Sequence, residues 1–208
     1  EDPANIDLPG YHTDYWEPLF ALAQEAELPV CMHIGGALPQ VTLEGKVPMV
    51  EIAAAFAHAG RSSVNMMCSH IPRKYPGVKL VWSEGGIGWI TAAIERADRQ
   101  WERHQYWTHV PYADVLPSEV AKRNMWFCMI EEPIGLKYRY DFRVDHILWE
   151  SDYPHADTPF PYTQSSVKEQ FEGVPAGEIE QMTHLNAEEL FGFPLSRQLI
   201  DQYSTPAA

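Results

Sequence analysis

The sequence predicts an α/β fold, a TIM (β/α)₈ barrel of which this chain supplies about the second half. Four short apolar runs alternate with helical patterns, which indicates a parallel sheet. Each run ends in polar residues or glycine, at the point where such a barrel places its chemistry. The chain has 208 residues, whereas complete barrels typically have about 250. We therefore expect residues 1–208 to form a single domain that lacks the N-terminal strands of a barrel.

The expected strands lie in four apolar runs, residues 28–36, 78–86, 124–132 and 146–154. Their nearly continuous hydrophobicity is typical of strands that are buried on both faces of a parallel sheet. A doubly wound open sheet has the same alternation of elements. No G-x-G-x-x-G or Walker motif follows any of these runs, which disfavours that alternative.

Helical patterns fill the intervals between the strands. In residues 16–27, apolar side chains recur at helical spacing. The further expected helices are the alanine-rich residues 48–59, residues 89–107 and segments within 165–191. The last helix, "NAEELFGF", is predicted to begin at Asn186 as N-cap and to end near Gly192. Four aromatic residues of 89–107 recur at helical spacing and indicate packing or the interface of a homodimer: Trp89, Trp101, Tyr106 and Trp107.

Composition restricts the partners of the chain. A hydrophobic content of 45% is typical of a globular protein, and a net charge of −14 disfavours nucleic acids and anionic membranes. No apolar run has the length of a membrane span, and the acidic start differs from a signal peptide. That start also lacks Met, which predicts a fragment. The three cysteines, Cys31, Cys68 and Cys128, have no C-x-x-C spacing, so we expect a reducing, cytoplasmic location.

Candidate functional residues stand where the expected strands end. His33 closes the first run, and its position at a strand end favours a metal ligand over a histidine satisfied within the core. Asp152 lies near the end of the fourth run, where a buried carboxylate requires a cation, N–H donors or a proton, although Asp is also common in turns. Glu84 lies near the end of the second run and is either a ligand, a general base or a helix N-terminal acid. His155 is a candidate for binding substrate, or for orienting a metal ligand by a hydrogen bond without binding the metal itself.

Other polar residues give weaker signals. Glu131 and Glu132 end the third run without a clear role. His12 and Tyr11 precede the first helix, where they are candidates to line an entrance. The other histidines considered are expected on the surface or in structural roles: His58, His70, His104, His109 and His184. No G-x-S-x-G motif is present, and Ser83 lacks the glycines of a nucleophile elbow, so a serine hydrolase is disfavoured.

Several of these motifs together resemble the amidohydrolase 2 family, the amidohydrolase-related proteins that include aminocarboxymuconate-semialdehyde decarboxylase. The motifs are "LPVCMHIGG", "YPGVKLVWSEGGIGW", "ILWESDYPHADTPFP" and "NAEELFGF", and the resemblance covers almost the whole chain. It implies a barrel of the metal-dependent hydrolase type with a mononuclear divalent metal, zinc or alternatively manganese, at its mouth. It further implies that His33 on the fifth strand and Asp152 on the eighth are metal ligands.

Two departures from the family pattern bear on function. The first-strand H-x-H metal motif has no counterpart in this chain, so further ligands would come from the missing half. Where the decarboxylases carry a histidine in A-H-G-G, this chain reads "SEGG", so Glu84 becomes a candidate ligand or base. We expect a metal-dependent hydrolase in which Glu84, Asp152 and His155 act on a small carboxylated or cyclic substrate through activated water. A non-oxidative decarboxylase and an inactive binding barrel are the alternatives.

Overall fold

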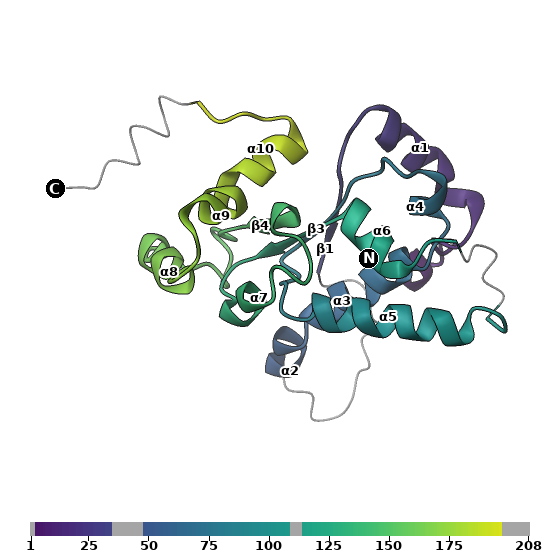
Figure 1. Ribbon diagram of the computed structural model, residues 1–208, viewed down its shortest axis with the longest axis horizontal. Coiled ribbons are helices and arrows are strands. Elements are labelled where there is room, and N and C mark those ends of the chain that lie inside the picture. The colour runs from purple at the N-terminus through teal and green to yellow at the C-terminus, as the bar shows by residue number, and fades with distance from the viewer. Residues whose placement is uncertain (1–2, 35–47, 109–113, 197–208) are drawn as a thin grey trace.

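A sheet of four parallel strands forms the centre of the computed structural model, which describes residues 3–34, 48–108 and 114–196 (Figure 1). The strands lie side by side in sequence order: β1 (Val30–His33), β2 (Leu80–Ser83), β3 (Met125–Met129) and β4 (Ile147–Trp149). Each falls within one of the four predicted runs. Every strand is shorter than its predicted run, and β4 is the shortest, with 3 residues.

The pairing register aligns the carboxyl ends of the strands. His33 at the end of β1 is paired with Ser83 at the end of β2, and Met129 at the end of β3 is paired with Trp149 at the end of β4. All three pairings are parallel. Residues that follow the strands therefore emerge at one edge of the sheet.

Helices and helical turns occupy the connections between the strands. Before β1 lie η1 (Pro3–Ile6), η2 (Asp14–Trp16) and α1 (Glu17–Glu25), and before β2 lie α2 (Pro48–Ala53), α3 (Phe56–Met67) and α4 (Ile71–Lys74). Before β3 lie α5 (Ile90–His104) and α6 (Pro117–Asn124), and before β4 lie α7 (Pro133–Lys137) and η3 (Val144–His146). After β4 come α8 (Thr163–Gln170), α9 (Ala176–Glu180), the π-helical turn η4 (Gln181–Leu185) and α10 (Asn186–Phe191). The helix predicted over 48–59 is divided after Ala53, and its second part continues to Met67.

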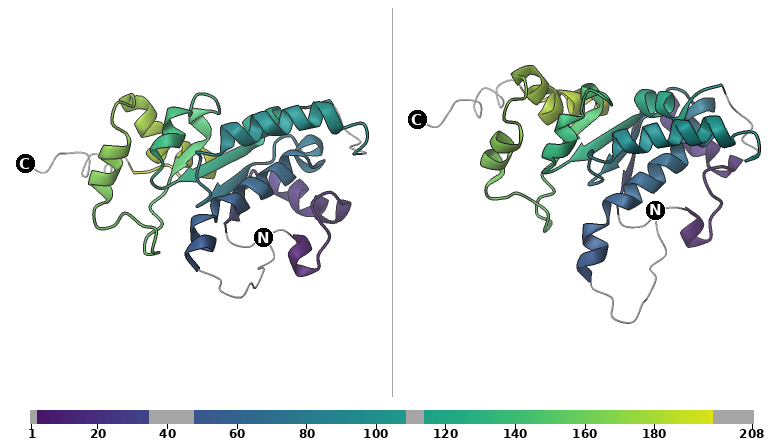
Figure 2. Two further views of the ribbon diagram at one scale, coloured as in Figure 1. Left: turned by 90° about the horizontal axis from the view of Figure 1, so that it is seen from below. Right: turned by 60° about the horizontal axis from the view of Figure 1, so that its bottom comes forward.

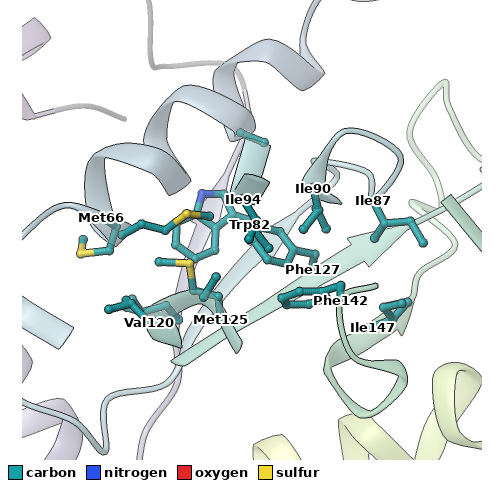
Figure 3. Packing of buried hydrophobic residues seen from close by; sticks show 14 of the residues in the cluster. Met66, Trp82, Ile87, Ile90, Ile94, Val120, Met125, Phe127, Phe142 and Ile147 are labelled. Carbon is teal, nitrogen blue, oxygen red and sulfur yellow. The ribbon is translucent and has the colours of Figure 1, made fainter. Parts of the chain in front are cut away.

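The main core lies between one face of the sheet and the helices α3, α5 and α6, of which α3 and α5 run alongside one another (Figure 2). The rings of Trp82 and Phe127 stack with centroids 5.4 Å apart. Met66, Ile90 and Val120 surround them from the three helices (Figure 3). Burial of this apolar surface stabilises the fold and fixes the sheet beneath the strand ends.

A smaller apolar cluster covers the opposite face of the sheet. Val81, Cys128 and Leu148 alternate with the residues of the main core along their strands and pack against Leu190 of α10. The prediction of strands buried on both faces is therefore confirmed for β2, β3 and β4. It is wrong for β1, where Cys31 is exposed, because β1 lies at the edge of the sheet.

The start of the last helix differs from the prediction. Asn186 is not an N-cap, because the π-helical turn η4 runs directly into α10 and the preceding residue Leu185 is already helical. The Asn186 side chain is buried and donates from Nδ2 to the carbonyls of Val144 (2.8 Å) and Ile147 (2.7 Å). It ties the C-terminal helix to the start of β4. The helix ends at Gly192 in the left-handed region, φ 62°, as predicted.

The aromatic residues of the third predicted helix divide into two groups. Trp101 is buried and Trp89 packs its ring edge-on against Phe127, which confirms packing for these two. Tyr106 and Trp107 lie beyond the end of α5 and are exposed. A role for them in a homodimer interface stays a prediction.

All three cysteines carry free thiols. Within the described ranges, every helix is too short or too polar to pass through a lipid bilayer.

Candidate metal centre

The four predicted site residues lie at the carboxyl edge of the sheet, where Glu84, Asp152 and His155 form one group and His33, outside that group, contacts Glu84. His33 is the last residue of β1, Glu84 directly follows β2, and Asp152 and His155 lie in the turn after β4. Glu84 contacts His33, and one ligand atom each of Glu84, Asp152 and His155 lie within 4.8 Å of one another. Gly35 and Gly36, which the sequence placed beside His33, lie outside the described residues.

The His33 ring has a defined orientation. Its Nδ1 lies 2.6 Å from the carbonyl oxygen of Ile34, and its Nε2 lies 2.8 Å from Oε1 of Glu84. Because a carbonyl oxygen and a carboxylate oxygen both only accept, both ring nitrogens donate in this arrangement, which is that of the protonated ring. A metal ion at Nε2 would take the place of that proton. The Ile34 carbonyl and the Glu84 carboxylate raise the pKa of the ring, and partial burial opposes them. A backbone acceptor behind one ring nitrogen is the arrangement that orients metal-binding histidines.

Both acidic residues of the centre have left-handed backbone conformations. Glu84 has φ 58° and Asp152 has φ 50°. Non-glycine residues in this region cost about 1–3 kcal/mol each and persist where the surrounding structure holds them. In both cases the chain turns sharply just after a buried strand, so the carboxylate is directed by the turn instead of by strand alternation.

Asp152 and His155 form a pair within one turn. Nδ1 of His155 lies 2.9 Å from Oδ2 of Asp152, and the His155 backbone N–H donates to the Asp152 carbonyl at 2.7 Å. The Asp152 side chain is 6% exposed and the His155 side chain is 71% exposed. The histidine therefore covers the buried carboxylate from the solvent side and leaves its own Nε2 available.

The donor set of this centre fits a divalent cation. Imidazole nitrogen and carboxylate oxygen are ligands that both zinc and manganese accept. Glu84, Asp152 and His155 each supply one such atom within the cluster, and the Nε2 atom of His33 adjoins Glu84. The assignment of individual ligands and catalytic roles to these four residues stays a prediction.

A fifth polar residue at this edge, Glu150, was not singled out from the sequence. Its Oε1 accepts the backbone N–H of Glu84 at 2.6 Å. Burial raises the pKa of the Glu150 carboxyl to about 7, the Glu84 N–H opposes that shift, and the carboxylates of Glu84 and Asp152 add to it. Alternation along β4 could have found it, because Glu150 shares a sheet face with Leu148 two residues earlier.

The acids after β3 have other partners. Glu132 accepts the backbone N–H of Ile87 at one carboxylate oxygen and faces that of Gly88 (3.4 Å) with the other, so it caps the segment that leads into α5. Glu131 accepts from the Ser166 hydroxyl of α8. Both line a cavity of about 190 Å³ that also touches Glu84 and Phe56. The carboxyl edge therefore offers a small recess beside the candidate centre.

Among the described residues, no other histidine belongs to the cluster of Glu84, Asp152 and His155. His70 contacts Glu17 (3.1 Å) at the start of α1, and His12 contacts Asn65 (2.6 Å) of α3. His58 and His104 lie in α3 and α5, and His184 lies in η4. His109 lies outside the described residues.

Comparison with known proteins places this geometry in context. A family model described as amidohydrolase matches residues 3–193. A search of curated proteins finds no match.

Solved structures give extensive matches to the fold. The 5-carboxyvanillate decarboxylase LigW from Sphingomonas paucimobilis superposes with a TM-score of 0.71 and 18% identity, over 88% of this chain and 54% of that one. An amidohydrolase from Mycobacterium avium subsp. paratuberculosis K-10 superposes with a TM-score of 0.68 and 21% identity, over 86% of this chain and 45% of that one. A dihydroxybenzoic acid decarboxylase from Polaromonas sp. JS666, with bound manganese and the inhibitor 2-nitroresorcinol, superposes with a TM-score of 0.67 and 15% identity. The match covers 91% of this chain and 57% of that one.

The chain spans about half the length of these solved structures. They are TIM-barrel proteins, and the four parallel strands of this chain match the corresponding part of their fold. The predicted fold class, about half of a TIM barrel, is confirmed.

Proposed function

Since the chain belongs to the amidohydrolase family, we propose that it is part of a divalent-metal-dependent hydrolase that acts on a small carboxylated or cyclic substrate. The observation that supports this most directly is the cluster at the carboxyl edge of the sheet. There Glu84, Asp152 and His155 offer three ligand atoms within 4.8 Å, and His33 contacts Glu84. Acidic and imidazole groups converge at the strand ends, which is where TIM barrels carry their active sites.

In this proposal His33, Glu84 and Asp152 hold the metal, together with residues of the remainder of the barrel. Zinc is the first candidate, and manganese is the second. The cation, when bound, supplies Lewis acidity that stabilises negative charge developing on the substrate. The Asp152 carboxylate is pre-positioned for this role, because it is almost fully enclosed and receives a hydrogen bond from His155.

Glu84 and His155 have further tasks around the centre. As the alternative to completing the ligand set, Glu84 takes the proton from the attacking water, because its carboxylate adjoins both His33 and the recess at the carboxyl edge. His155 orients Asp152 through Nδ1 and presents Nε2, which can donate a hydrogen bond to substrate, toward solvent. Hydrolysis needs a base at this place, and a carboxylate supplies one.

Non-oxidative decarboxylation is the second candidate function. Two of the solved structures with high TM-scores are named decarboxylases, of 5-carboxyvanillate and of dihydroxybenzoic acid. A decarboxylase would have to deliver a proton to carbon, a task for which Glu84 would act in its protonated form. Incubation of the full-length protein with 2,6-dihydroxybenzoate and 5-carboxyvanillate, with release of CO₂ as the readout, distinguishes this reaction from hydrolysis of esters, amides or lactones.

The metal requirement is tested by elemental analysis of the full-length protein after dialysis at pH 7. We expect about one equivalent of metal in the native protein and a loss of metal and turnover in Asp152→Ala. Glu102→Ala, which removes an exposed carboxylate on α5, should behave like the native protein. Native protein that holds no metal and has no affinity for added zinc or manganese would instead favour a binding barrel without catalysis.

We further propose a small-molecule substrate, a homodimer and a cytoplasmic location. Neither nucleic acids nor membranes are expected partners, because the chain carries a net charge of −14. The exposed Trp107 and Tyr106 at the end of α5 are candidates for the dimer contact. Light scattering tests the homodimer by measuring the molar mass of the native protein and of Trp107→Ala. We expect a dimer for the native protein and a monomer for the variant.

A further inference from the structure

We propose that Glu150 is a positioning residue, which holds the backbone at Glu84 and thereby directs the Glu84 carboxylate toward His33 and the Asp152–His155 pair. This inference rests on the proposed function in one respect, namely that Glu84 acts in the site. The contact itself is independent of any metal, because it joins a side chain to a backbone N–H within the chain.

The contact crosses the end of an intervening strand. The Glu150 backbone N–H continues the pairing with β3 by donating to the Met129 carbonyl at 2.9 Å. Its side chain then reaches past β3 to the residue after β2, where Oε1 accepts the Glu84 N–H at 2.6 Å. Glu150 therefore joins the ends of three neighbouring strands, through its backbone N–H to β3 and through its carboxylate to the residue after β2.

Glu84 needs such a restraint because of its backbone conformation. With φ at 58°, a non-glycine residue is held against its intrinsic preference. The next two residues are Gly85 and Gly86, of which Gly86 also has positive φ (69°). Glycines impose few restrictions of their own, so a fixed N–H at Glu84 defines where the turn begins.

The direction of the two Glu84 contacts connects this restraint to the site. Its backbone N–H faces Glu150 after β4, and its carboxylate faces His33 on β1. A residue bonded on both sides has little freedom to rotate. If the backbone bond were lost, the left-handed turn would be free to relax, and the carboxylate would move away from His33 and Asp152.

The environment of Glu150 argues against a merely solvated acid. The groups that act on it are the Glu84 N–H, the Cys128 thiol and the carboxylates of Glu84 and Asp152. A third carboxyl group beside two others is unfavourable unless hydrogen-bond donors compensate it. The backbone N–H of Glu84 is the donor that the geometry provides.

Amide hydrogen exchange of the full-length protein tests the proposal at the bond itself. Glu150→Leu removes the acceptor, and Glu150→Asp keeps the carboxyl group but shortens the reach. In both variants we expect the Glu84 amide to exchange about tenfold faster, as for loss of one hydrogen bond. The amides of Val81 and Trp82 within β2 should be unchanged. Glu150→Gln keeps an acceptor oxygen of the same reach and should retain the protection.

Leu148→Ala is the matched control, because it opens the same sheet face without touching the Glu84 N–H. It should leave the ratio of Glu84 exchange to Trp82 exchange unchanged. Zn²⁺ affinity gives the second readout: Glu150→Asp should weaken it about tenfold and Glu150→Gln should restore it.

Two results would overturn the proposal: unchanged Glu84 exchange in Glu150→Asp, or equal acceleration in Glu150→Gln and Glu150→Asp. Failure of the native protein to bind Zn²⁺ would count against the proposed function alone, because the exchange experiment does not involve metal.

Discussion

His155 donates from Nδ1 to Oδ2 of Asp152 across 2.9 Å, and the two side chains differ sharply in exposure, 71% against 6%. The donor is therefore accessible while the acceptor is enclosed. This pair gives the centre a buried carboxylate whose second oxygen is already occupied, which orients the first.

Removal of the donor should weaken metal binding without removing the ligand. In His155→Ala we expect the affinity for Zn²⁺ or Mn²⁺ to fall about 10–100-fold, as for other partners that orient a ligand. His155→Asn, which places an amide N–H near the position of Nδ1, should recover part of the loss. Competition with a chromophoric chelator measures both, and equal affinity in native protein and His155→Ala would contradict the role of the pair.

Gly86 is expected to be intolerant of a side chain. Its φ is 69°, and a Cβ atom would lie 2.7 Å from Oε1 of Glu132. Gly86→Ala should lower the free energy of unfolding by about 1–3 kcal/mol, because the backbone is strained and the Glu132 cap is displaced. Urea unfolding measures the change. Gly177→Ala in α9, where a Cβ meets nothing within 4 Å, should be neutral or stabilising; similar losses in both variants would refute the local explanation.

Asn186 should be important for stability. Its substitution by Ala removes a donor from the buried carbonyl of Ile147 and one of two donors from the partly buried carbonyl of Val144, which also accepts the Ile147 N–H. The expected loss is about 2–3 kcal/mol in the free energy of unfolding. Glu189→Ala, at an exposed position of the same helix, should change the stability by less than about 0.5 kcal/mol. A loss of that small size in Asn186→Ala would show that the side chain is not a tie between α10 and β4.

His146 should make the fold sensitive to acid. Burial lowers the pKa of its ring from 6.5 to about 4, with Arg143 contributing, although the Met125 carbonyl opposes the shift. Between those two pH values the unfolded chain binds a proton that the folded chain does not, so the contribution of His146 to stability decreases as pH falls from 6.5 to 4. The expected decrease is on the order of 2 kcal/mol.

The experiment for His146 compares unfolding at pH 7 and pH 5 in native protein and in His146→Gln. The Gln amide can still donate to the Met125 carbonyl, which accepts from Nδ1 of His146 at 2.8 Å, but it does not titrate. The variant should lose less stability than the native protein over this interval. An identical pH dependence in the two proteins would exclude His146 as the titrating group.

The sequence predicted the features that depend on periodicity and on strand ends. Buried runs identified all four strands, and the rule that chemistry follows parallel strands brought His33, Glu84, Asp152 and His155 together at one edge. These inferences needed no side-chain geometry, because parallel pairing alone aligns the residues that follow the strands.

The errors concern side chains whose partners are distant in the sequence. Asn186 has the composition of an N-cap, yet its amide bonds to Val144 and Ile147, about forty residues away in sequence. Alternation places Glu150 on the sheet face of Leu148, but its contact with the backbone N–H of Glu84 depends on a left-handed turn that no residue pattern predicts. Local propensity cannot reveal either contact, since both arise only when separate elements pack.

The origin of the site residues has a consequence for how this scaffold can vary. His33 ends a strand, and Glu84, Glu150 and Asp152 lie within three residues after one, whereas the helices contribute mainly to the core beneath. Helical segments could therefore be shortened, lengthened or exchanged by recombination while the spacing of the reactive groups is preserved. Related proteins can therefore differ in their helices and still keep the same reactive groups at the strand ends.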